Sequence, residues 1–311
     1  MSKSLKVLFF GNERIATGIS SEPVLLRTLL DSPHEVVGLV IHAKEAKSRT
    51  NKSEPIVELA ESAGIQVINP ENLTDHVQEI KDFGADIGVL VAYGKIVPAE
   101  IIDLFEHGII NLHPSALPKL RGSTPIESVI LSGENSTAVS IMKLAPKMDA
   151  GPLLAQRSVD ISAGASKQQL ANQLHSEGTK LMLEVLAQIS IGDAEEQEQD
   201  ESNATFCSTI KKSDGHIDWS KSAVQIEREI RAYAGWPTSY FEITDQRYVV
   251  ISADTSTETI SNFTGTVVVG QNTLGVQCGE GVVWITYIQP AGKKEMPVSA
   301  FLNGYRSKLE V

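Results

Sequence analysis

Between Lys6 and Leu112, short apolar runs alternate with amphipathic stretches, and this alternation constrains the fold more than any other feature of the sequence. The apolar runs are typical of buried strands, and the stretches between them have helical periodicity. Strands that alternate with helices predict an open, mostly parallel α/β sheet. The expected strands are Lys6–Gly11, Glu35–Ile41, Ile65–Ile68, Ile87–Val91 and Gly108–Leu112, and the expected helices are Pro23–Leu30, Pro55–Ala63, Leu73–Phe83 and Pro98–Phe105.

An acidic, polar segment at residues 192–203 divides the sequence. It contains nothing apolar that could anchor a core, so it is the best candidate for a domain boundary. Two further strands, Thr137–Leu144 and Leu153–Ile161, and a long amphipathic helix, Lys167–Ile191, precede it. We therefore expect a first, α/β domain at residues 1–192, a linker at 193–209 and a second domain at 210–311.

The second domain is expected to contain short strands separated by Gly-rich turns. Such strands predict a small β-barrel, and the oligonucleotide-binding (OB) type is one arrangement that fits. The expected strands are Tyr240–Ile243, Tyr248–Ser252, Thr266–Val269, Leu274–Cys278 and Val282–Gln289, with helices at Ala223–Tyr233 and Val298–Leu302.

The formal net charge of −12 argues against a protein that holds nucleic acid by a uniform positive field. Residues 210–311 carry ten Lys and Arg against eleven Asp and Glu, so this part of the chain repels RNA least. No apolar segment is long enough to span a membrane, and the start lacks the features of a secretory signal. Cys207 and Cys278 have no disulfide or metal spacing. We therefore expect a cytoplasmic protein without a metal site.

The segment from Asn111 to Gly122 carries the clearest chemical signal. Side chains alternate along a strand, so Asn111 and His113 point to one face at the strand's C-terminal end, where open α/β sheets bind ligands. Pro114 ends the strand, and Pro118 favours an irregular loop over that point. A donor amide and an imidazole can thus converge on one small volume. Taken alone, an Asn-x-His pair more often marks a packed histidine beside a turn.

Two further segments are expected at the same edge of the sheet. Met148–Pro152 sets the carboxylate of Asp149 in a tight turn, although an ordinary Asp-x-Gly turn is the alternative. Val91–Gly94 ends another strand and could offer backbone hydrogen bonds to a flat heterocycle, with a structural turn as an equal alternative. The segment after the first strand, Gly11–Gly18, lacks the Gly-x-Gly-x-x-Gly spacing, so a dinucleotide cofactor is not indicated.

With these segments, the chain resembles the methionyl-tRNA formyltransferases, a group of formyltetrahydrofolate-dependent enzymes. The first-domain motifs are common to transferases and hydrolases that use formyltetrahydrofolate, so they imply the chemistry without the acceptor. The acceptor is implied by the second domain, where Ile210–Trp219 is similar to the segment that joins the two domains in that family. Further similar motifs are Arg231-Ala232-Tyr233, Trp236-Pro237 and Gln289–Lys294.

The resemblance implies transfer of the formyl group of 10-formyltetrahydrofolate to the α-amino group of methionyl-initiator tRNA, in translation initiation, by a monomer. Asn111 and His113 would donate hydrogen bonds to the oxygen of the tetrahedral intermediate, and Asp149 would take a proton from the attacking amine. A formyltransferase acting on an amino sugar or another small amine would share this catalytic set and remains the alternative.

The resemblance also implies binding residues. Folate contacts are expected at Val91, Ala92, Tyr93, Gly94, Ser115, Leu117, Pro118 and Met148. Substrate contacts are expected at Arg121 and Gly122, where a structural salt bridge of Arg121 is the alternative. The basic loop after the second strand lacks the glycines of the family and is either a tRNA contact or a solvated loop. Its cations are Lys44, Lys47, Arg49 and Lys52.

Overall fold

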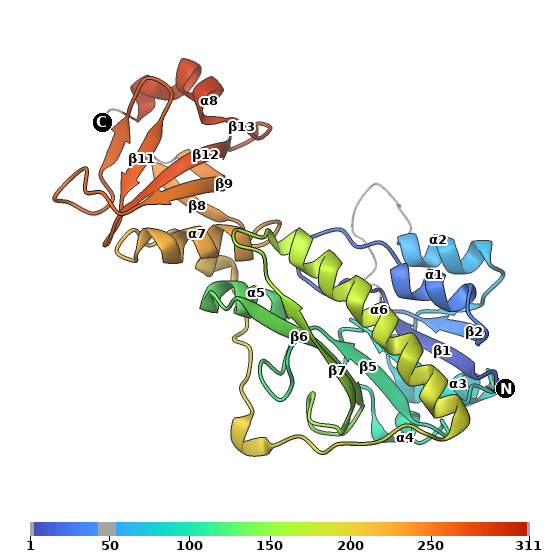
Figure 1. Cartoon of the computed structure of the whole chain (residues 1–311). Helices are drawn as coiled ribbons and strands as arrows, with labels where there is room; N and C mark the ends of the chain where they lie inside the picture. The colour runs from blue at the N-terminus through green and yellow to red at the C-terminus, as the bar shows by residue number, and fades with distance from the viewer. Residues whose placement is uncertain (1–2, 43–53, 245, 310–311) are drawn as a thin grey trace.

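The first part of the chain forms a seven-stranded sheet, seen in a computed structural model that describes residues 3–42, 54–244 and 246–309 (Figure 1). The strand order is β3-β2-β1-β4-β5-β6-β7. The five strands from β3 to β5 are parallel, and β6 and β7 are antiparallel to their neighbours. The strands are β1 Lys6–Gly11, β2 Glu35–Val40, β3 Val67–Ile68, β4 Ile87–Val91, β5 Ile109–His113, β6 Ser136–Lys143 and β7 Leu153–Asp160. The predicted mostly parallel α/β sheet is confirmed.

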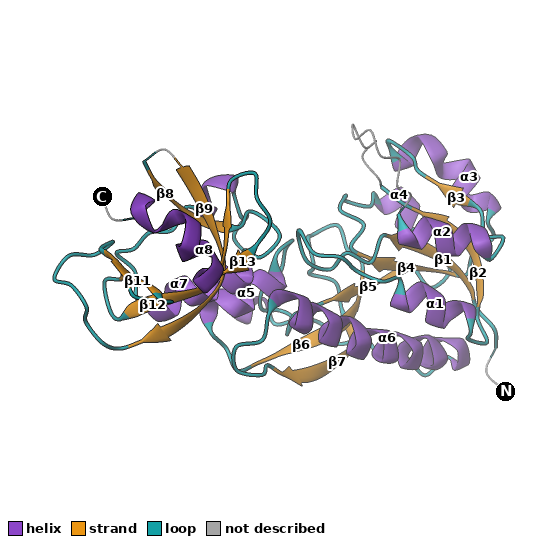
Figure 2. Ribbon diagram, turned by 90° about the horizontal axis from the view of Figure 1, so that it is seen from above, coloured by secondary structure: helices purple, strands orange, loops and turns teal. Residues whose placement is uncertain are grey.

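Helices cover both faces of this sheet because its central strands alternate apolar side chains between two cores. In β1, Val7 and Phe9 belong to one core, and Leu8 and Phe10 belong to the other. Figure 2 shows α1 and α6 on one side of the sheet and α3 and α4 on the other. The helices are α1 Val24–Leu30, α2 Pro55–Ser62, α3 Val77–Asp82, α4 Ala99–Ile102, α5 Pro125–Ser132 and α6 Lys167–Ile191. Within the described ranges, no helix combines the length and the apolar character that a membrane crossing needs.

Three of these helices differ from the sequence expectation. Helix α5 was not expected, although Pro125 occupies its first turn, where a proline is favourable. The helix expected at Pro98–Phe105 ends at Ile102. The stretch expected as one helix from Leu73 begins as a 3₁₀ turn before α3. Short helices have weak hydrophobic periodicity. The residues around α5 are typical of loops, so the sequence there did not indicate a helix.

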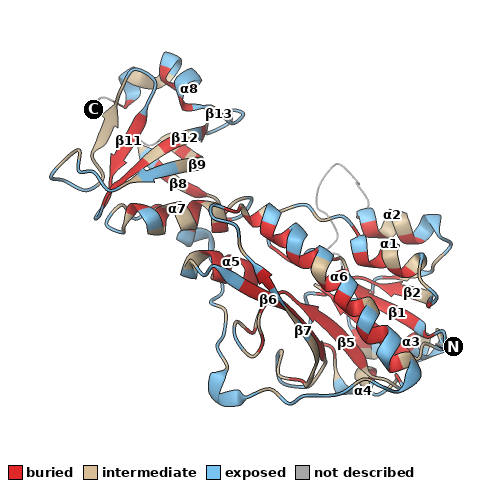
Figure 3. Ribbon diagram, in the orientation of Figure 1, coloured by how far each residue is buried: buried red, intermediate tan, exposed pale blue. Residues whose placement is uncertain are grey.

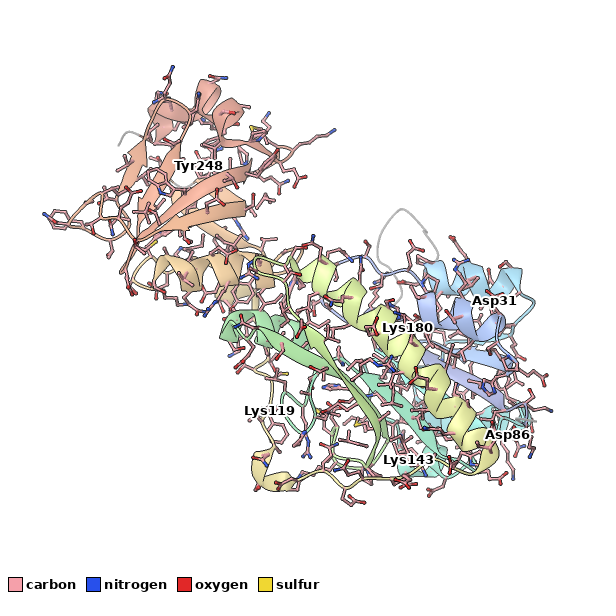
Figure 4. All side chains as sticks on the ribbon, in the orientation of Figure 1. Asp31, Asp86, Lys119, Lys143, Lys180 and Tyr248 are labelled. Carbon is pink, nitrogen blue, oxygen red and sulfur yellow. The ribbon has the colours of Figure 1, made fainter. Side chains whose placement is uncertain are left out.

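The second part of the chain forms an antiparallel, six-stranded sheet with a core of its own. Its order is β10-β11-β12-β9-β8, and β13 pairs with β12. The curled sheet is consistent with the expected small barrel. Tyr248 lies inside it, stacked on Phe241 and edge-on to Phe301 (Figure 4). Figure 3 shows that much of β11 and β12 is buried. The elements are α7 Ala223–Ala232, β8 Ser239–Ile243, β9 Gln246–Ser256, β10 Val267–Val269, β11 Leu274–Gln277, β12 Val282–Pro290, β13 Met296–Pro297 and α8 Val298–Tyr305.

The segment 193–209 does not hang free between the two sheets. Figure 1 shows it leaving α6 and running along the first sheet before it rises to α7. Gln197 pairs with Leu153 in an antiparallel bridge, and Phe206 pairs with Arg121 in a parallel bridge. The backbone N–H of Arg121 donates to the Thr205 carbonyl at 2.9 Å. Backbone pairing therefore attaches this polar segment to the loop that follows β5.

Candidate active site

A pocket of about 410 Å³ opens at the C-terminal edge of the parallel strands. Segments that follow β1, β4, β5 and β6 contribute its walls, as expected for an open α/β sheet. Eight of the residues expected from the sequence line it together: Ala92, Tyr93, Gly94, Asn111, His113, Gly122, Met148 and Asp149. The pocket therefore collects polar side chains from segments far apart in the sequence.

Asn111 and His113 are buried at the end of β5, with 6% and 4% of their surface exposed. The Asn111 carboxamide lines the pocket and makes no hydrogen bond to a described residue. His113 Nε2 lies 3.1 Å from the carbonyl oxygen of Leu120. A carbonyl only accepts, so Nε2 carries the proton in this contact. This hydrogen bond fixes the ring with Nδ1 toward the carboxylate of Asp149.

Asp149 Oδ2 lies 3.8 Å from His113 Nδ1 and accepts a hydrogen bond from the backbone N–H of Gly122 at 2.7 Å. The Nδ1–Oδ2 distance exceeds that of a hydrogen bond. The turn that carries the carboxylate depends on Gly151, because a Cβ there would lie 1.9 Å from the carbonyl oxygen of Lys143. Amide, imidazole and carboxylate therefore face one volume, and the carboxylate is held from the loop after β5.

The backbone around the pocket is strained. Ala92, Leu120 and Asp149 have φ angles of 50°, 57° and 49°. A left-handed conformation costs a residue with a side chain about 1–2 kcal/mol, and such residues cluster at functional sites. Ala92 and Asp149 line the pocket, and Leu120 supplies the carbonyl that orients His113. The left-handed conformations of these three residues therefore lower the stability of the folded protein, and the surrounding structure maintains them.

Tyr93 presents a polar atom without a protein partner. Its ring packs edge-on against Phe10, and its hydroxyl is buried with no hydrogen-bond partner among the described residues. Burial raises the pKa of Tyr93 to about 12, so the hydroxyl keeps its proton at neutral pH and can donate. Tyr93 contributes to the pocket lining, but its hydroxyl itself is shielded from solvent.

Four residues expected at the folate site lie outside the pocket lining. Val91 is fully buried in the core of the sheet. The Ser115 hydroxyl donates to the Lys119 carbonyl at 2.7 Å, within the loop. Leu117 is buried, and its carbonyl accepts from the side-chain amide of Gln156 at 2.9 Å. Neither these three residues nor Pro118 lines the pocket. Lys44, Lys47, Arg49 and Lys52 lie outside the described residues.

Arg121 also faces away from the pocket. Its side chain is fully buried, and Nη2 donates to Gln199 at 2.9 Å and to Glu201 at 2.8 Å. Hydrogen bonds from Arg121 and Lys147 lower the pKa of Glu201 to about 2. The salt bridge that was the structural alternative for Arg121 is therefore present, and both of its partners lie in the segment 193–209.

Several pocket residues were not singled out from the sequence. Arg14 and Ile15 line the pocket from the segment after β1, and Lys95 and Ile96 line it after β4. Arg14 also pairs with Glu54. These residues follow predicted strands directly, and the ends of parallel strands meet at one edge of the sheet. Their positions in the sequence could therefore have indicated that they line the site.

Comparison with known proteins shows the family to which the chain belongs. A family model described as formyl transferase matches residues 13–186, and a second, described as formyl transferase, C-terminal domain, matches residues 209–306. The chain belongs to the formyl transferase family. A methionyl-tRNA formyltransferase of Chloroflexus aurantiacus is 36% identical over 96% of this chain and 97% of its own length. One of a Sulfurihydrogenibium species is 33% identical over 98% of each chain. The resemblance inferred from the sequence motifs is confirmed.

Solved structures of low sequence identity share the fold. The N-formyltransferase from Helicobacter canadensis, in complex with folinic acid and dTDP-3-aminofucose, has a TM-score of 0.67 and 17% identity, and the match covers 94% of this chain and 100% of that one. HypX from Aquifex aeolicus, in complex with tetrahydrofolic acid, has a TM-score of 0.65 and 16% identity over 97% of this chain. The chain spans about half of the length of HypX, 48%.

Proposed function

We propose that this protein transfers the formyl group of 10-formyltetrahydrofolate to the α-amino group of methionyl-initiator tRNA. The observation that carries the proposal is the meeting of Asn111, His113 and Asp149 at one pocket, with His113 Nδ1 3.8 Å from Asp149 Oδ2. The methionyl-tRNA formyltransferase relatives support it, because they match nearly the whole chain, including the second domain.

The pocket suits the pterin end of a folate. Its volume of about 410 Å³ lies in the range of small-molecule sites, roughly 300–1,000 Å³. Ala92, Gly94 and Met148 line its wall, and peptide groups are the kind of partner that a flat heterocycle can bond to.

Attack of a neutral amine on a formyl carbon places negative charge on the formyl oxygen and positive charge on the nitrogen. The Asn111 carboxamide is buried and uncommitted, so its N–H group can donate to that oxygen without first breaking another bond. Removing one such donor typically lowers the rate by about 10²–10³-fold. Asn111 is therefore the principal oxyanion donor in the proposed mechanism.

His113 and Asp149 handle the protons. The Asp149 carboxylate takes a proton from the attacking nitrogen, directly or through one water. That proton passes to His113 Nδ1, the ring nitrogen that is not bonded to Leu120, and His113 delivers it to the leaving nitrogen of the folate. Because Nδ1 and Oδ2 are 3.8 Å apart, they cannot share a proton directly. The reacting group or a water between them has to carry it.

Substitution of the proton-handling residues tests the mechanism. We expect Asp149→Asn and His113→Ala each to lower kcat for formyl transfer by about 10²–10⁴-fold. His107 precedes β5 at the end opposite His113, and Asp160 is an exposed residue that ends β7, so His107→Ala and Asp160→Asn are matched controls. Near-normal kcat in a folded variant of His113 or Asp149 would remove that residue from the mechanism.

The acceptor requires a separate test. Formylation of charged initiator tRNA and of amino-sugar nucleotides is compared at equal enzyme concentration and stated salt. We expect transfer to methionyl-tRNA at a kcat/KM several orders of magnitude higher. Transfer to an amino sugar alone would replace the proposed acceptor and leave the chemistry in place. The same assay tests the proposed tRNA contacts after β2, by substitution of these cations. They are Lys44, Lys47, Arg49 and Lys52, which lie outside the described residues.

A further inference from the structure

The side chain of Gln199 uses its full hydrogen-bonding capacity beside the candidate active site. Its Oε1 accepts from Arg121 Nε at 3.2 Å and from Arg121 Nη2 at 2.9 Å. Its Nε2 donates to the carbonyl of Asp149 at 2.9 Å and to the carbonyl of Gly151 at 2.7 Å. A side-chain amide has two donor hydrogens and one acceptor oxygen with two lone pairs. Gln199 is therefore held in one orientation by Arg121 at its oxygen and by the carbonyls of Asp149 and Gly151 at its nitrogen.

Gln199 joins the two loops that place the carboxylate of Asp149. The first loop contains Arg121 and Gly122, and the N–H of Gly122 donates to Asp149 Oδ2 at 2.7 Å. The second is the turn of Asp149 itself, where Gln199 bonds the carbonyl of that residue and the carbonyl of Gly151. The side-chain amide of Gln199 thus connects Arg121, which precedes Gly122, to the backbone of the turn that carries Asp149.

The turn needs such support because the φ angle of Asp149 is 49°. A strained residue keeps its conformation only where its surroundings over-determine it. The carbonyl bonds from Gln199 fix the peptide groups after Asp149, and Gly151 packs against Lys143 with no room for a Cβ. Without these bonds the carboxylate would depend on the hydrogen bond from the Gly122 N–H for its place near His113.

The opposite end of the amide matters for Arg121. This guanidinium is fully buried, and its Nη1 has no hydrogen-bond partner among the described residues. Glu201 supplies the counter-charge, and Gln199 accepts the Nε hydrogen bond that would otherwise be lost. An incompletely paired buried cation is costly, so both partners hold the segment 193–209 against the loop.

We propose that Gln199 is a positioning residue for formyl transfer: it holds the turn of Asp149 at the distance from His113 that the reaction needs. The inference rests on the proposed function. It places a determinant of catalysis in the segment between the two domains, at a residue that does not line the pocket. Gln199 acts through Asp149 and touches no substrate.

Gln199→Glu separates the two ends of the side chain. A glutamate keeps both acceptor bonds to Arg121 but loses the donors that face the carbonyls of Asp149 and Gly151. Gln197→Glu is the charge-matched control, because Gln197 is an exposed residue two positions earlier that pairs with Leu153 through backbone only. Gln199→Met is a second variant of similar length without added charge.

The measurement is kcat and KM for methionyl-tRNA and for 10-formyltetrahydrofolate, with the pH profile of kcat. We expect Gln199→Glu and Gln199→Met to lower kcat about 10–10²-fold, the scale of a misplaced catalytic group, with both KM values within about twofold of wild type. We expect an altered pH profile, since Asp149 and His113 exchange protons with the reacting group. Gln197→Glu should match wild type throughout.

The outcomes separate this inference from the proposed function. Wild-type kcat in a folded Gln199→Glu or Gln199→Met protein, alongside loss of activity in Asp149→Asn, overturns the inference and leaves formyl transfer standing. A rise in KM with unchanged kcat also overturns it, because it would indicate a binding role. Absence of formyl transfer from the wild-type protein to any amine overturns both.

Discussion

Asn111 offers the cleanest test at the scale of one residue, because its carboxamide is buried and uncommitted. Asn111→Asp keeps the shape, removes the N–H donor and places a carboxylate where negative charge develops in the proposed reaction. We expect kcat to fall by at least about 10²-fold, with a smaller change in KM for the folate, in steady-state assays.

The control for this change is Asn135→Asp, which makes the same substitution at an exposed residue just before β6. It should leave kcat unchanged. A kcat for Asn111→Asp within about threefold of the control would exclude Asn111 as an oxyanion donor, since a lost donor typically costs about 10²–10³-fold.

Glu201 predicts a pH dependence of stability. Hydrogen bonds from Arg121 and Lys147 lower its pKa to about 2 in the folded state, from 4.5. A carboxyl whose pKa is lowered by folding stabilises the protein above its unfolded pKa, and this contribution is lost as the pH falls from 4.5 toward about 2. Wild type should therefore exceed Glu201→Gln in urea midpoint at neutral pH, and the difference should narrow through that range.

Glu198→Gln is the control for the pH experiment, because Glu198 is exposed and forms no ion pair with any residue in the described ranges. Its midpoint should follow wild type at each pH. If the difference in urea midpoint between wild type and Glu201→Gln stays constant from neutral to acid pH, ionisation of Glu201 does not contribute to the stability of the folded protein.

Residue patterns predict where Asn111, His113 and Asp149 meet but not how they are held. Strand alternation and the meeting of strand ends at one edge are general rules, and they place these side chains at one pocket. The partners of Arg121 have no such rule, because a hydrogen bond from a distant polar residue leaves no periodic trace. Ser115 shows the same limit, since its position in a motif does not reveal whether it faces the ligand or its own loop.

At the scale of elements, helix α6 predicts a packing effect beneath the catalytic strand. Gly178 of α6 faces Leu112, the residue between Asn111 and His113, and an added Cβ would lie 2.6 Å from Leu112 Cδ1. Overpacking of a filled core costs about 1–3 kcal/mol. We expect Gly178→Val to lower the free energy of unfolding by about 1–3 kcal/mol or more. It should also reduce formyl transfer, because β5 must shift.

Ala187→Val isolates the packing term, because it adds a β-branched residue on the exposed face of the same helix. Helix propensity alone should cost about 0.7 kcal/mol or less there. Equal losses of unfolding free energy in the two variants, measured by urea denaturation, would mean that α6 does not press on Leu112.

Element types were largely predictable from the sequence, and element directions were not. The central strands β1, β4 and β5 are almost fully buried and read as continuous apolar runs, so the predicted positions match closely in β1 and β4. The antiparallel direction of β6 and β7 depends on the connections between strands and has no signature in hydrophobicity. The short helix α5 was missed because its eight residues directly follow the irregular loop.

At the scale of the whole molecule, polar contacts connect parts that apolar patterning separates. The segment 193–209 was expected to be a linker because its acidic part offers nothing apolar to a core, and in the structure Gln199 and Glu201 attach it to Arg121. Apolar contacts also cross between the two parts, since Ala232 and Tyr233, at the end of α7, belong to the core of the first sheet. Both kinds of contact arise from the tertiary arrangement, which local sequence patterns do not encode.

Gly235 tests this connection, because an added Cβ there would lie 1.9 Å from the carbonyl oxygen of Gly18, in the loop that also carries Arg14 and Ile15 to the pocket. Gly292 is a matched control: its φ of 71° resembles the 78° of Gly235, but no atom lies within 4 Å of its added Cβ. Alanine costs about 1 kcal/mol or more at either position through left-handed strain. We expect only Gly235→Ala to lose further stability and to raise KM for the folate, in denaturation and steady-state assays. Equal effects of the two substitutions would mean that the contact with Gly18 does not couple the second domain to the pocket.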